Sequence, residues 1–141
     1  RYGEEPVKAH TAAIAFDLDN FKSVNDRYGH AAGDAVLKVF ADVLRDVCNT
    51  AACVARLGGE EFVVVLDRTM PDRAQRIAER IRMDFAAKLI PIGGRSITCT
   101  VSAGIAFGIE DSVSFDSLLN NADKALYTAK RNGRNRVALA A

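Results

Sequence analysis

Alternating apolar residues in the first part of the chain predict a β-strand. In residues 12–18 the larger apolar side chains occupy every second position, which is typical of a strand with one face against a core. This strand brings Asp17 to its C-terminal end. Apolar residues then recur at helical spacing from Asp34 to Val47, which predicts an amphipathic helix of about four turns that begins at the acidic residue.

Two short apolar runs around a pair of glycines predict a β-hairpin. The runs are Cys53–Leu57 and Phe62–Leu66, and Gly58-Gly59-Glu60-Glu61 lies between them. Glycine adopts positive φ without strain, so a Gly-Gly pair favours a tight turn between adjacent strands. The predicted turn carries two acidic side chains at its tip.

A helix and a long strand are predicted after this hairpin. The helix begins at Pro71 and carries an apolar side chain every four residues. These apolar residues are Ile77, Ile81, Phe85 and Leu89. Residues Ile97–Phe107 follow with the pattern of a long strand, bent where Gly104 interrupts it.

The last part of the chain completes an α+β pattern. A helix is predicted over Phe115–Ala129, ended by Asn132-Gly133, and Val137–Leu139 forms a short closing strand. The order β-α-β-β-α-β-α-β predicts an α+β fold in which helices flank a central, mostly antiparallel five-stranded sheet. A length of 141 residues fits a single domain over residues 1–141.

Composition and charge exclude several functional classes. Nineteen basic and eighteen acidic side chains give a formal net charge of +1, too little for the basic field of a dedicated nucleic-acid binder. No apolar run approaches the roughly 18 residues of a membrane helix, so we expect no membrane contact by this domain. The sequence lacks Gly-x-x-x-x-Gly-Lys-[Ser/Thr], which excludes a P-loop NTPase.

The cysteines favour a reducing compartment. Cys48, Cys53 and Cys99 are widely spaced and lie in apolar or alanine-rich stretches. An odd number of such residues favours small buried thiols over a disulfide or a metal site. We therefore expect a cytoplasmic location, either of the whole protein or of the cytoplasmic domain of a membrane-anchored one.

Acidic residues at the end of the first strand are candidates for binding a cation. Asp17 and Asp19 suit a hard ion such as Mg²⁺, which prefers oxygen ligands, although two solvated acids at the start of a turn would give the same pattern. Glu60 reaches the same ion if the two strands are adjacent. A two-carboxylate site that leaves positions for phosphate oxygens is usual in nucleotidyl transfer.

Two basic residues bracket the end of the last helix. Lys130 and Arg134 are four residues apart, and cations at this position complement the helix dipole. The same pair is suited to a triphosphate, because a guanidinium offers a planar fork and an ammonium a point charge. The sequence leaves both roles open.

Three blocks of the chain resemble the GGDEF domain of bacterial diguanylate cyclases. The blocks are Phe16–Asp26 (FDLDNFKSVND), Gly58–Phe62 (GGEEF, a common form of the signature) and Ala122–Asn135, which contains ADKALYTAK and GRN. They follow one another in the order and spacing of that family. The resemblance implies a palm-like nucleotidyl-cyclase fold and the condensation of two GTP into cyclic di-GMP and two pyrophosphates.

The resemblance also implies metal and base recognition by particular residues. A divalent metal, Mg²⁺ or Mn²⁺, would be held by the carboxylates of Asp17 and Glu60 and by the backbone carbonyl of Leu18. Asn25 and Asp34 would recognise guanine. A carboxylate accepts hydrogen bonds from N1–H and the exocyclic amine of guanine together, a pair that adenine does not offer.

The remaining substrate contacts implied by the family involve the phosphates and the reacting hydroxyl. The expected groups are the backbone amides of Asn20 and Phe21, the side chains of Lys22, Lys130 and Arg134, and the backbone of Gly58 and Gly59. The general base stays open between Glu60 and Glu61, and polarisation by the metal can make a dedicated base unnecessary.

The implied reaction needs two copies of the domain. Each copy would hold one GTP, and the 3′-hydroxyl of one nucleotide would attack the α-phosphorus of the other across a two-fold homodimer. The family usually opens with a Leu-Thr-Gly-Leu-x-Asn-Arg segment, which this chain starts too late to include. We therefore expect an upstream sensory or receiver domain in a longer protein.

Two further expectations concern regulation. The family's inhibitory product site, Arg-x-x-Asp, ends five residues before the first signature glycine, where this chain has Asn49 and Ala52. We therefore expect no inhibitory product site. The alternative function is a non-catalytic GTP-binding regulatory module, and a product-binding receptor is a third possibility that the missing Arg-x-x-Asp disfavours.

Overall fold

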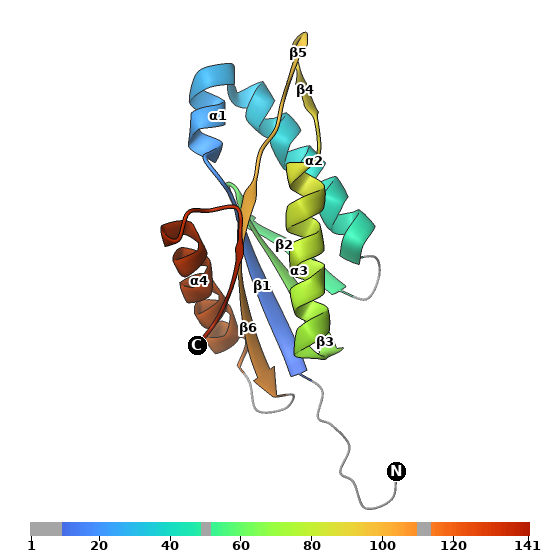
Figure 1. Ribbon diagram of the computed structural model, residues 1–141, viewed down its shortest axis with the longest axis vertical. Helices are drawn as coiled ribbons and strands as arrows, with labels where there is room; N and C mark the ends of the chain where they lie inside the picture. Colours follow the sequence, from blue (N-terminus) through green and yellow to red (C-terminus); the bar gives the residue numbers. More distant parts are fainter. Residues whose placement is uncertain (1–9, 49–51, 110–113) are drawn as a thin grey trace, which may run out of the picture.

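The computed structural model describes residues 10–48, 52–109 and 114–141, and Figure 1 shows their arrangement. The elements in chain order are β1 (His10–Leu18), α1 (Phe21–Tyr28), α2 (His30–Cys48), β2 (Ala52–Gly58), β3 (Glu61–Thr69), α3 (Pro71–Ala86), β4 (Ile90–Ile92), β5 (Arg95–Ile97), β6 (Val101–Ile109), α4 (Phe115–Arg131) and β7 (Val137–Leu139). Every strand and helix that the sequence predicts has a counterpart in this series. Helix α1 and the β4–β5 pair are additional.

The main sheet has five strands in the order β2-β3-β1-β6-β7. All neighbouring pairs are antiparallel except β6 and β7, which are parallel. The expected α+β fold with a central, mostly antiparallel five-stranded sheet is therefore confirmed. Strand β1 lies in the middle, so residues at its C-terminal end adjoin residues of both β3 and β6.

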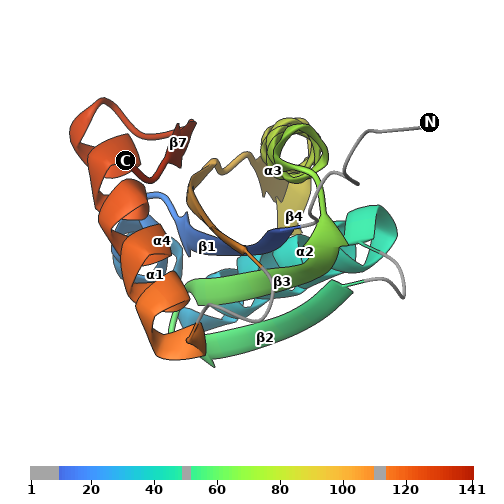
Figure 2. The ribbon, with the colours of Figure 1, turned by 90° about the horizontal axis from the view of Figure 1, so that it is seen from below.

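Helices cover both faces of this sheet. Figure 2 shows α4 on one side of the strands, with α2 and α3 on the other. The alternation along β1 explains the division, because Ile14 and Phe16 belong to the large core under α2 and α3, whereas Ala13 and Ala15 face α4. Small side chains on the second face let the backbone of α4 come close to the sheet.

Phe40 of α2 joins four elements of the large core. Its ring meets those of Phe16, Phe62 and Phe85 edge to face, with centroids 5.6, 5.0 and 5.0 Å apart. Such pairs contribute about 0.5–1.5 kcal/mol each beyond the area that they bury. The ring cluster fixes α2 against β1, β3 and α3.

The first two helices differ from the prediction. Helix α1 was not expected. It spans only eight residues, and its apolar residues Phe21, Val24 and Tyr28 share one face and pack against the large core. Helix α2 begins at His30 rather than at Asp34. Gly29 ends α1 with φ 93°, and its carbonyl accepts from the backbone N–H of residues 32 and 33, which opens α2 directly.

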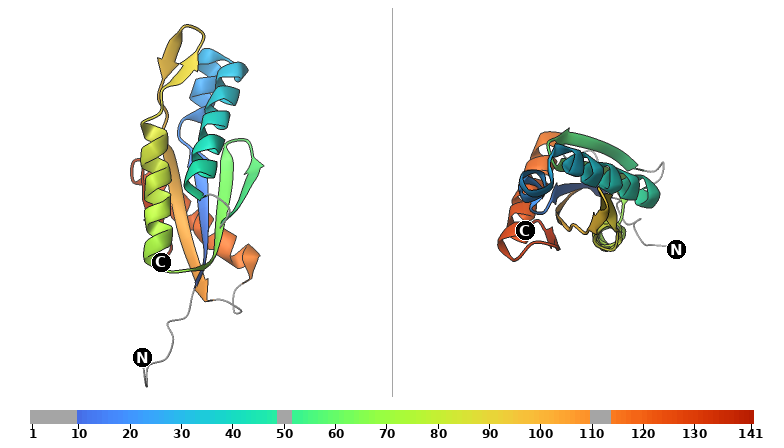
Figure 3. Two further views of the ribbon diagram at one scale, coloured as in Figure 1. Left: turned by 90° about the vertical axis from the view of Figure 1, so that its right-hand side faces the viewer. Right: turned by 90° about the horizontal axis from the view of Figure 1, so that it is seen from above.

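The predicted long strand at Ile97–Phe107 is also corrected. Strand β6 begins at Val101, and Ile97 belongs instead to a two-stranded sheet of β4 and β5. Gly93 and Gly94 turn this hairpin with φ 41° and 74°, the positive pair that a type I′ turn needs. Figure 3 shows the hairpin projecting beyond the main sheet beside α1 and α2.

Two expectations about burial are wrong. Leu89 lies beyond the end of α3 and is 71% exposed, whereas Ile81 and Phe85 of the same expected stripe are buried. Cys53 is exposed, while Cys48 and Cys99 are buried, and all three thiols are free. Cys53 is exposed because β2 is an edge strand.

Gly104 marks a close approach between α4 and β6 rather than a bend. Its pairing with Ala15 continues the β1–β6 register without a bulge. A Cβ at this position would lie 2.1 Å from the backbone nitrogen of Leu126 and 2.3 Å from the carbonyl oxygen of Ala122. Neither backbone atom can move without displacing α4, so only glycine fits.

We expect Gly104→Ala to lower the free energy of unfolding by about 3 kcal/mol, because the added methyl group overpacks against backbone atoms. Urea unfolding of the variant measures this. Gly94→Ala is the control, since its Cβ meets open space and only the positive φ is strained, at a cost of about 1 kcal/mol. Equal losses in both variants would contradict the steric explanation.

Candidate active site at the end of the central strand

Antiparallel pairing brings the two expected acidic segments together. Asp17 of β1 is in register with Glu61 of β3 and with Ser102 of β6. The backbone N–H of Leu18 donates to the carbonyl of Glu60 across 3.2 Å. The end of the first strand and the tip of the glycine turn are therefore adjacent, as the sequence predicted.

The glycine turn has the backbone conformation for which glycine is needed. Gly58 and Gly59 have φ 153° and 51°, and a Cβ on either would meet open space. The constraint is therefore backbone conformation rather than crowding. Arg56 Nε donates to the carbonyl of Gly59 across 3.0 Å and holds the turn from the edge strand.

An acidic cleft lies beside this turn. It has a volume of about 220 Å³ and is lined by Asp17, Glu61, Asp123, Leu126, Tyr127 and Lys130. Helix α4 supplies the last four of these residues, and Lys130 Nζ lies 2.7 Å from Asp17 Oδ1. The cleft thus combines three carboxylates with one ammonium group.

Burial raises the pKa of each of these carboxylates. The pKa of Asp17 is raised from its usual value, chiefly because the side chain is buried, and the hydrogen bond and charge of Lys130 offset this only in part. Burial also raises the pKa of Glu61, reinforced by repulsion from Asp17, Asp123 and Glu60. Burial alone raises the pKa of Asp123.

The donor set fits a divalent metal that shares its coordination with a ligand. Asp17, Glu60 and the carbonyl of Leu18 offer oxygen atoms, which Mg²⁺ prefers. Oδ1 of Asp17 is buried, and the ammonium of Lys130 lies 2.7 Å from it. The described residues contain no cluster of three or more His, Cys, Asp or Glu side chains suited to a metal.

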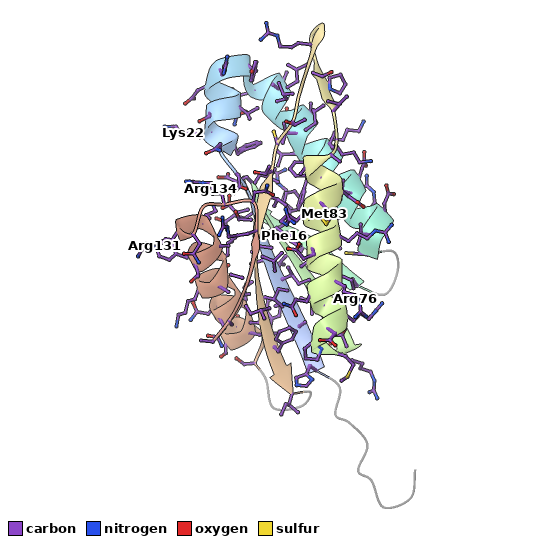
Figure 4. All side chains as sticks on the ribbon, viewed as in Figure 1. Phe16, Lys22, Arg76, Met83, Arg131 and Arg134 are labelled. Atoms are coloured by element: carbon purple, nitrogen blue, oxygen red, sulfur yellow. The ribbon has the colours of Figure 1, made fainter. Side chains whose placement is uncertain are left out.

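The segments expected to bind phosphate flank the same end of β1. Asn20 adopts a left-handed conformation with φ 57° and caps the N-terminus of α1, whose first residue is Phe21. Lys22 is exposed on the first turn of α1, and Arg134 is exposed in the turn after α4. Figure 4 shows these two side chains on the same side of the molecule.

The pair expected to recognise guanine lies where α1 meets α2. A Cβ on Gly33 would lie 1.9 Å from Asn25 Oδ1, so the amide of Asn25 rests against the backbone of α2. Asp34 follows on the same helix and is exposed. The absence of a side chain at Gly33 therefore makes room for Asn25 next to Asp34.

Sequence reasoning missed two features of the site. Asp123 enters the cleft from α4, and the only signal for it was its spacing of seven residues from Lys130, which places both on one helix face. Asp19 is not a free strand-end acid, because its carboxylate accepts from Thr100, Ser102 and the backbone of Asn135. That network joins segments far apart in the sequence.

A comparison with known sequences identifies the family. A sequence profile described as "Diguanylate cyclase, GGDEF domain" matches residues 4–136. The chain belongs to this family. It is 44% identical over 132 residues to Diguanylate cyclase A of Treponema denticola and 43% identical over 124 residues to diguanylate cyclase DgcP of Pseudomonas aeruginosa. Those matches cover 94% and 88% of this chain, but only 36% and 18% of the two relatives.

Solved structures of GGDEF domains share the fold. The GGDEF domain of DgcB from Caulobacter crescentus, solved in complex with c-di-GMP, matches 94% of this chain and 78% of its own, with a TM-score of 0.88 and 33% identity. The active GGEEF domain of a Vibrio cholerae diguanylate cyclase matches 94% and 84%, with a TM-score of 0.86 and 34% identity.

The structure describes one of the two positions of the family's product site. Ala52 opens β2 at the position of the second charged anchor, and Asn49 lies outside the described residues.

None of the helices in the described ranges combines the length and apolar character that spanning a membrane requires.

We expect Asp17→Asn to stabilise the GGDEF domain by about 1 kcal/mol at neutral pH, because the amide cannot ionise in the buried position. The folded pKa of Asp17 lies above the usual pKa of an aspartate, so wild-type stability falls as pH rises from that usual pKa through the folded pKa. The advantage of the variant should therefore disappear near pH 3.

Urea unfolding across this pH range measures the difference. Asp46→Asn, at an exposed position of α2, is the matched control and should show no comparable trend. If Asp17→Asn were less stable than the wild type at neutral pH, attraction to Lys130 would outweigh burial, and the electrostatic account would be wrong.

Proposed function

We propose that this GGDEF domain is a diguanylate cyclase that condenses two GTP into cyclic di-GMP and two pyrophosphates. The observation that carries the proposal is the meeting of Asp17 with the Glu60-Glu61 turn beside Lys130. The family match and the identity to named diguanylate cyclases support the same activity.

In this proposal the acidic residues hold the metal, and the basic residues hold the triphosphate. Asp17, Glu60 and the carbonyl of Leu18 would bind Mg²⁺ or Mn²⁺, which when bound neutralises charge on the α-phosphate and the leaving pyrophosphate. Lys130 already contacts Asp17, so its ammonium is placed to exchange that carboxylate for phosphate oxygens. Arg134 adds a planar fork for a second pair of oxygens.

Backbone groups orient the phosphates. The amides of Asn20 and Phe21 stand at the N-terminus of α1, where the helix dipole favours an anion. The turn at Gly58 and Gly59 carries no side chain, so a nucleotide can approach its backbone closely. These groups would fix the α-phosphorus for in-line attack.

The proposed general base is chosen by comparing the pKa and the expected role of Glu60 and Glu61. Glu61 has a raised pKa because of burial and neighbouring carboxylates, which brings a carboxyl group closer to the range useful for proton transfer. Glu60 is assigned to the metal. Glu61 is therefore the better candidate to accept the proton of the attacking 3′-hydroxyl.

Guanine selectivity is assigned to Asn25 and Asp34. The carboxylate of Asp34 would accept from N1–H and the exocyclic amine of guanine, and Asn25 would complete the polar edge. Adenine would leave these groups unpaired, and unpaired polar groups in a binding site are costly. The domain should therefore select GTP strongly over ATP.

Catalysis would require a second copy of the chain. One domain holds one GTP, so a two-fold homodimer must bring two half-sites face to face. We propose that residues 1–141 form one domain of a longer cytoplasmic or membrane-anchored protein, in which an upstream sensory or receiver domain controls dimerisation. A monomer would bind GTP without reacting.

We expect Glu60→Gln to lower the rate of cyclic di-GMP synthesis by at least about 100-fold, because a metal-binding charge is lost. The domain should stay folded, because the amide has nearly the same shape as the carboxylate. The assay uses the chain fused to a dimerising coiled coil, incubated with GTP and Mg²⁺, with products separated by chromatography. Asp46→Asn is the matched charge-neutralising control and should retain wild-type rates.

The same assay separates the two candidate functions. Formation of cyclic di-GMP by the wild-type fusion supports the enzyme, whereas GTP that is bound but recovered unchanged supports the non-catalytic regulatory module. The enzyme proposal fails if the fusion is dimeric, binds GTP and releases no product.

Added cyclic di-GMP should inhibit this domain weakly or not at all, because neither charged anchor of the product site is present at residues 49 and 52 and no bidentate arginine–carboxylate pair is available there. Progress curves with increasing product measure this. Strong noncompetitive inhibition would contradict the prediction. Competitive inhibition at high product concentration would not, since product also fits the substrate site.

A further inference from the structure

Asp19 is buried in the candidate site, yet none of the proposed substrate contacts uses its side chain. It is 4% exposed and lies between Leu18, assigned to the metal, and Asn20, assigned to phosphate. A buried carboxylate is costly unless it is paired or fully hydrogen-bonded. The arrangement around Asp19 must therefore explain its presence.

The carboxylate of Asp19 is satisfied by the protein itself. Oδ1 accepts from Ser102 Oγ across 2.7 Å, and Oδ2 accepts from Thr100 Oγ1 across 2.7 Å and from the backbone N–H of Asn135 across 3.0 Å. Its own backbone N–H donates to the carbonyl of Thr100. Both oxygens thus accept hydrogen bonds from donors of the protein.

The bond to Asn135 reaches a strained turn. Arg134 and Asn135 both have left-handed backbones, with φ 64° and 48°, which residues with a Cβ adopt only at a cost. Such a conformation persists where surrounding contacts hold it. Three contacts hold these two residues from outside the turn: Arg134 N–H to the carbonyl of Ala129, Arg82 Nη1 to Asn135 Oδ1, and Asn135 N–H to Asp19. Within the turn, Arg136 Nε donates to the carbonyl of Arg134, and the carbonyl of Arg136 accepts from Ala103 N–H of β6.

Only one of these contacts links the turn to the phosphate-binding end of β1. The bond to Ala129 stays within the end of α4, and Arg82 comes from α3. Asp19 precedes Asn20 directly, so one residue connects the start of α1 to the segment that carries Arg134. Bonds to a carboxylate are about twice as strong as bonds between neutral groups.

We propose that Asp19 is a positioning residue that fixes the 132–136 turn and thereby directs Arg134 toward the nucleotide phosphates. It touches neither substrate nor metal and acts through Asn135. The part that concerns phosphate rests on the proposed function, whereas the anchoring of the turn does not.

Two variants separate this role from general stability. Asp19→Ala removes all three hydrogen bonds, including the one from Asn135. Ser102→Ala is the matched control, because Ser102 is fully buried and donates to Oδ1, the carboxylate oxygen that does not accept from Asn135. Asp19→Asn is the conservative variant, since its amide oxygen can still accept from Thr100 and Asn135 while its NH₂ group faces the Ser102 hydroxyl.

Hydrogen exchange of the 141-residue chain, followed in peptides that cover residues 132–136, tests the anchor without any nucleotide. We expect exchange in this segment to be at least tenfold faster in Asp19→Ala and about threefold faster in Asp19→Asn. Ser102→Ala should exchange at the wild-type rate there. If Asp19→Ala does not fold, Asp19→Asn decides, and wild-type exchange in a folded Asp19 variant overturns the proposal.

Binding of a non-hydrolysable GTP analogue with Mg²⁺, measured by calorimetry, tests the link to Arg134. We expect Asp19→Asn to raise Kd about threefold in the wild-type background and to have little further effect in Arg134→Ala. An equal effect in both backgrounds overturns the action through Arg134. If the wild type does not bind the analogue, the proposed function fails, while the exchange experiment still decides on the anchor.

Discussion

A buried carboxylate at the end of the central strand is the constraint around which the site is built. Asp17 is 8% exposed, and its burial raises its pKa despite the ammonium of Lys130 2.7 Å away. One lysine therefore does not supply enough positive charge for the three carboxylates of the cleft. A divalent ion with bound phosphate oxygens would meet this remaining demand, so the cost of burial is consistent with a binding site rather than with a structural ion pair.

Local patterns in the sequence predicted most of the fold. The alternation in β1 separates large side chains on one buried face from alanines on the other. The stripes of α3 and α4 follow from one buried face each, and Gly58-Gly59 correctly indicated a turn. The same signal is present at Gly93-Gly94. The two strands that it joins are only three residues long, too short to show an alternating pattern. Helix α1 escaped prediction for a related reason, since its apolar face of Phe21, Val24 and Tyr28 lies within only eight residues.

The site was predictable only as far as strand adjacency could be inferred. Asp17 and Glu60 were expected to converge only if the first strand and the glycine hairpin are adjacent, and the structure pairs β1 with β3. Asp123 and the network of Asp19 depend on how α4 and β6 pack against β1, with partners up to 116 residues apart. No local pattern encodes such contacts, so these parts of the site required the three-dimensional structure.

The missing side chain at Gly104 limits how far α4, which carries Lys130, can move relative to the sheet. Because the backbone of α4 rests directly on β6 at this point, the helix has no layer of flexible side chains on which to slide. Lys130 lies one turn beyond Leu126 on the same helix, so this contact also fixes the position of its backbone. If two such halves must meet for reaction, as proposed, each arrives already shaped, and the control of timing passes to whatever brings the two copies together.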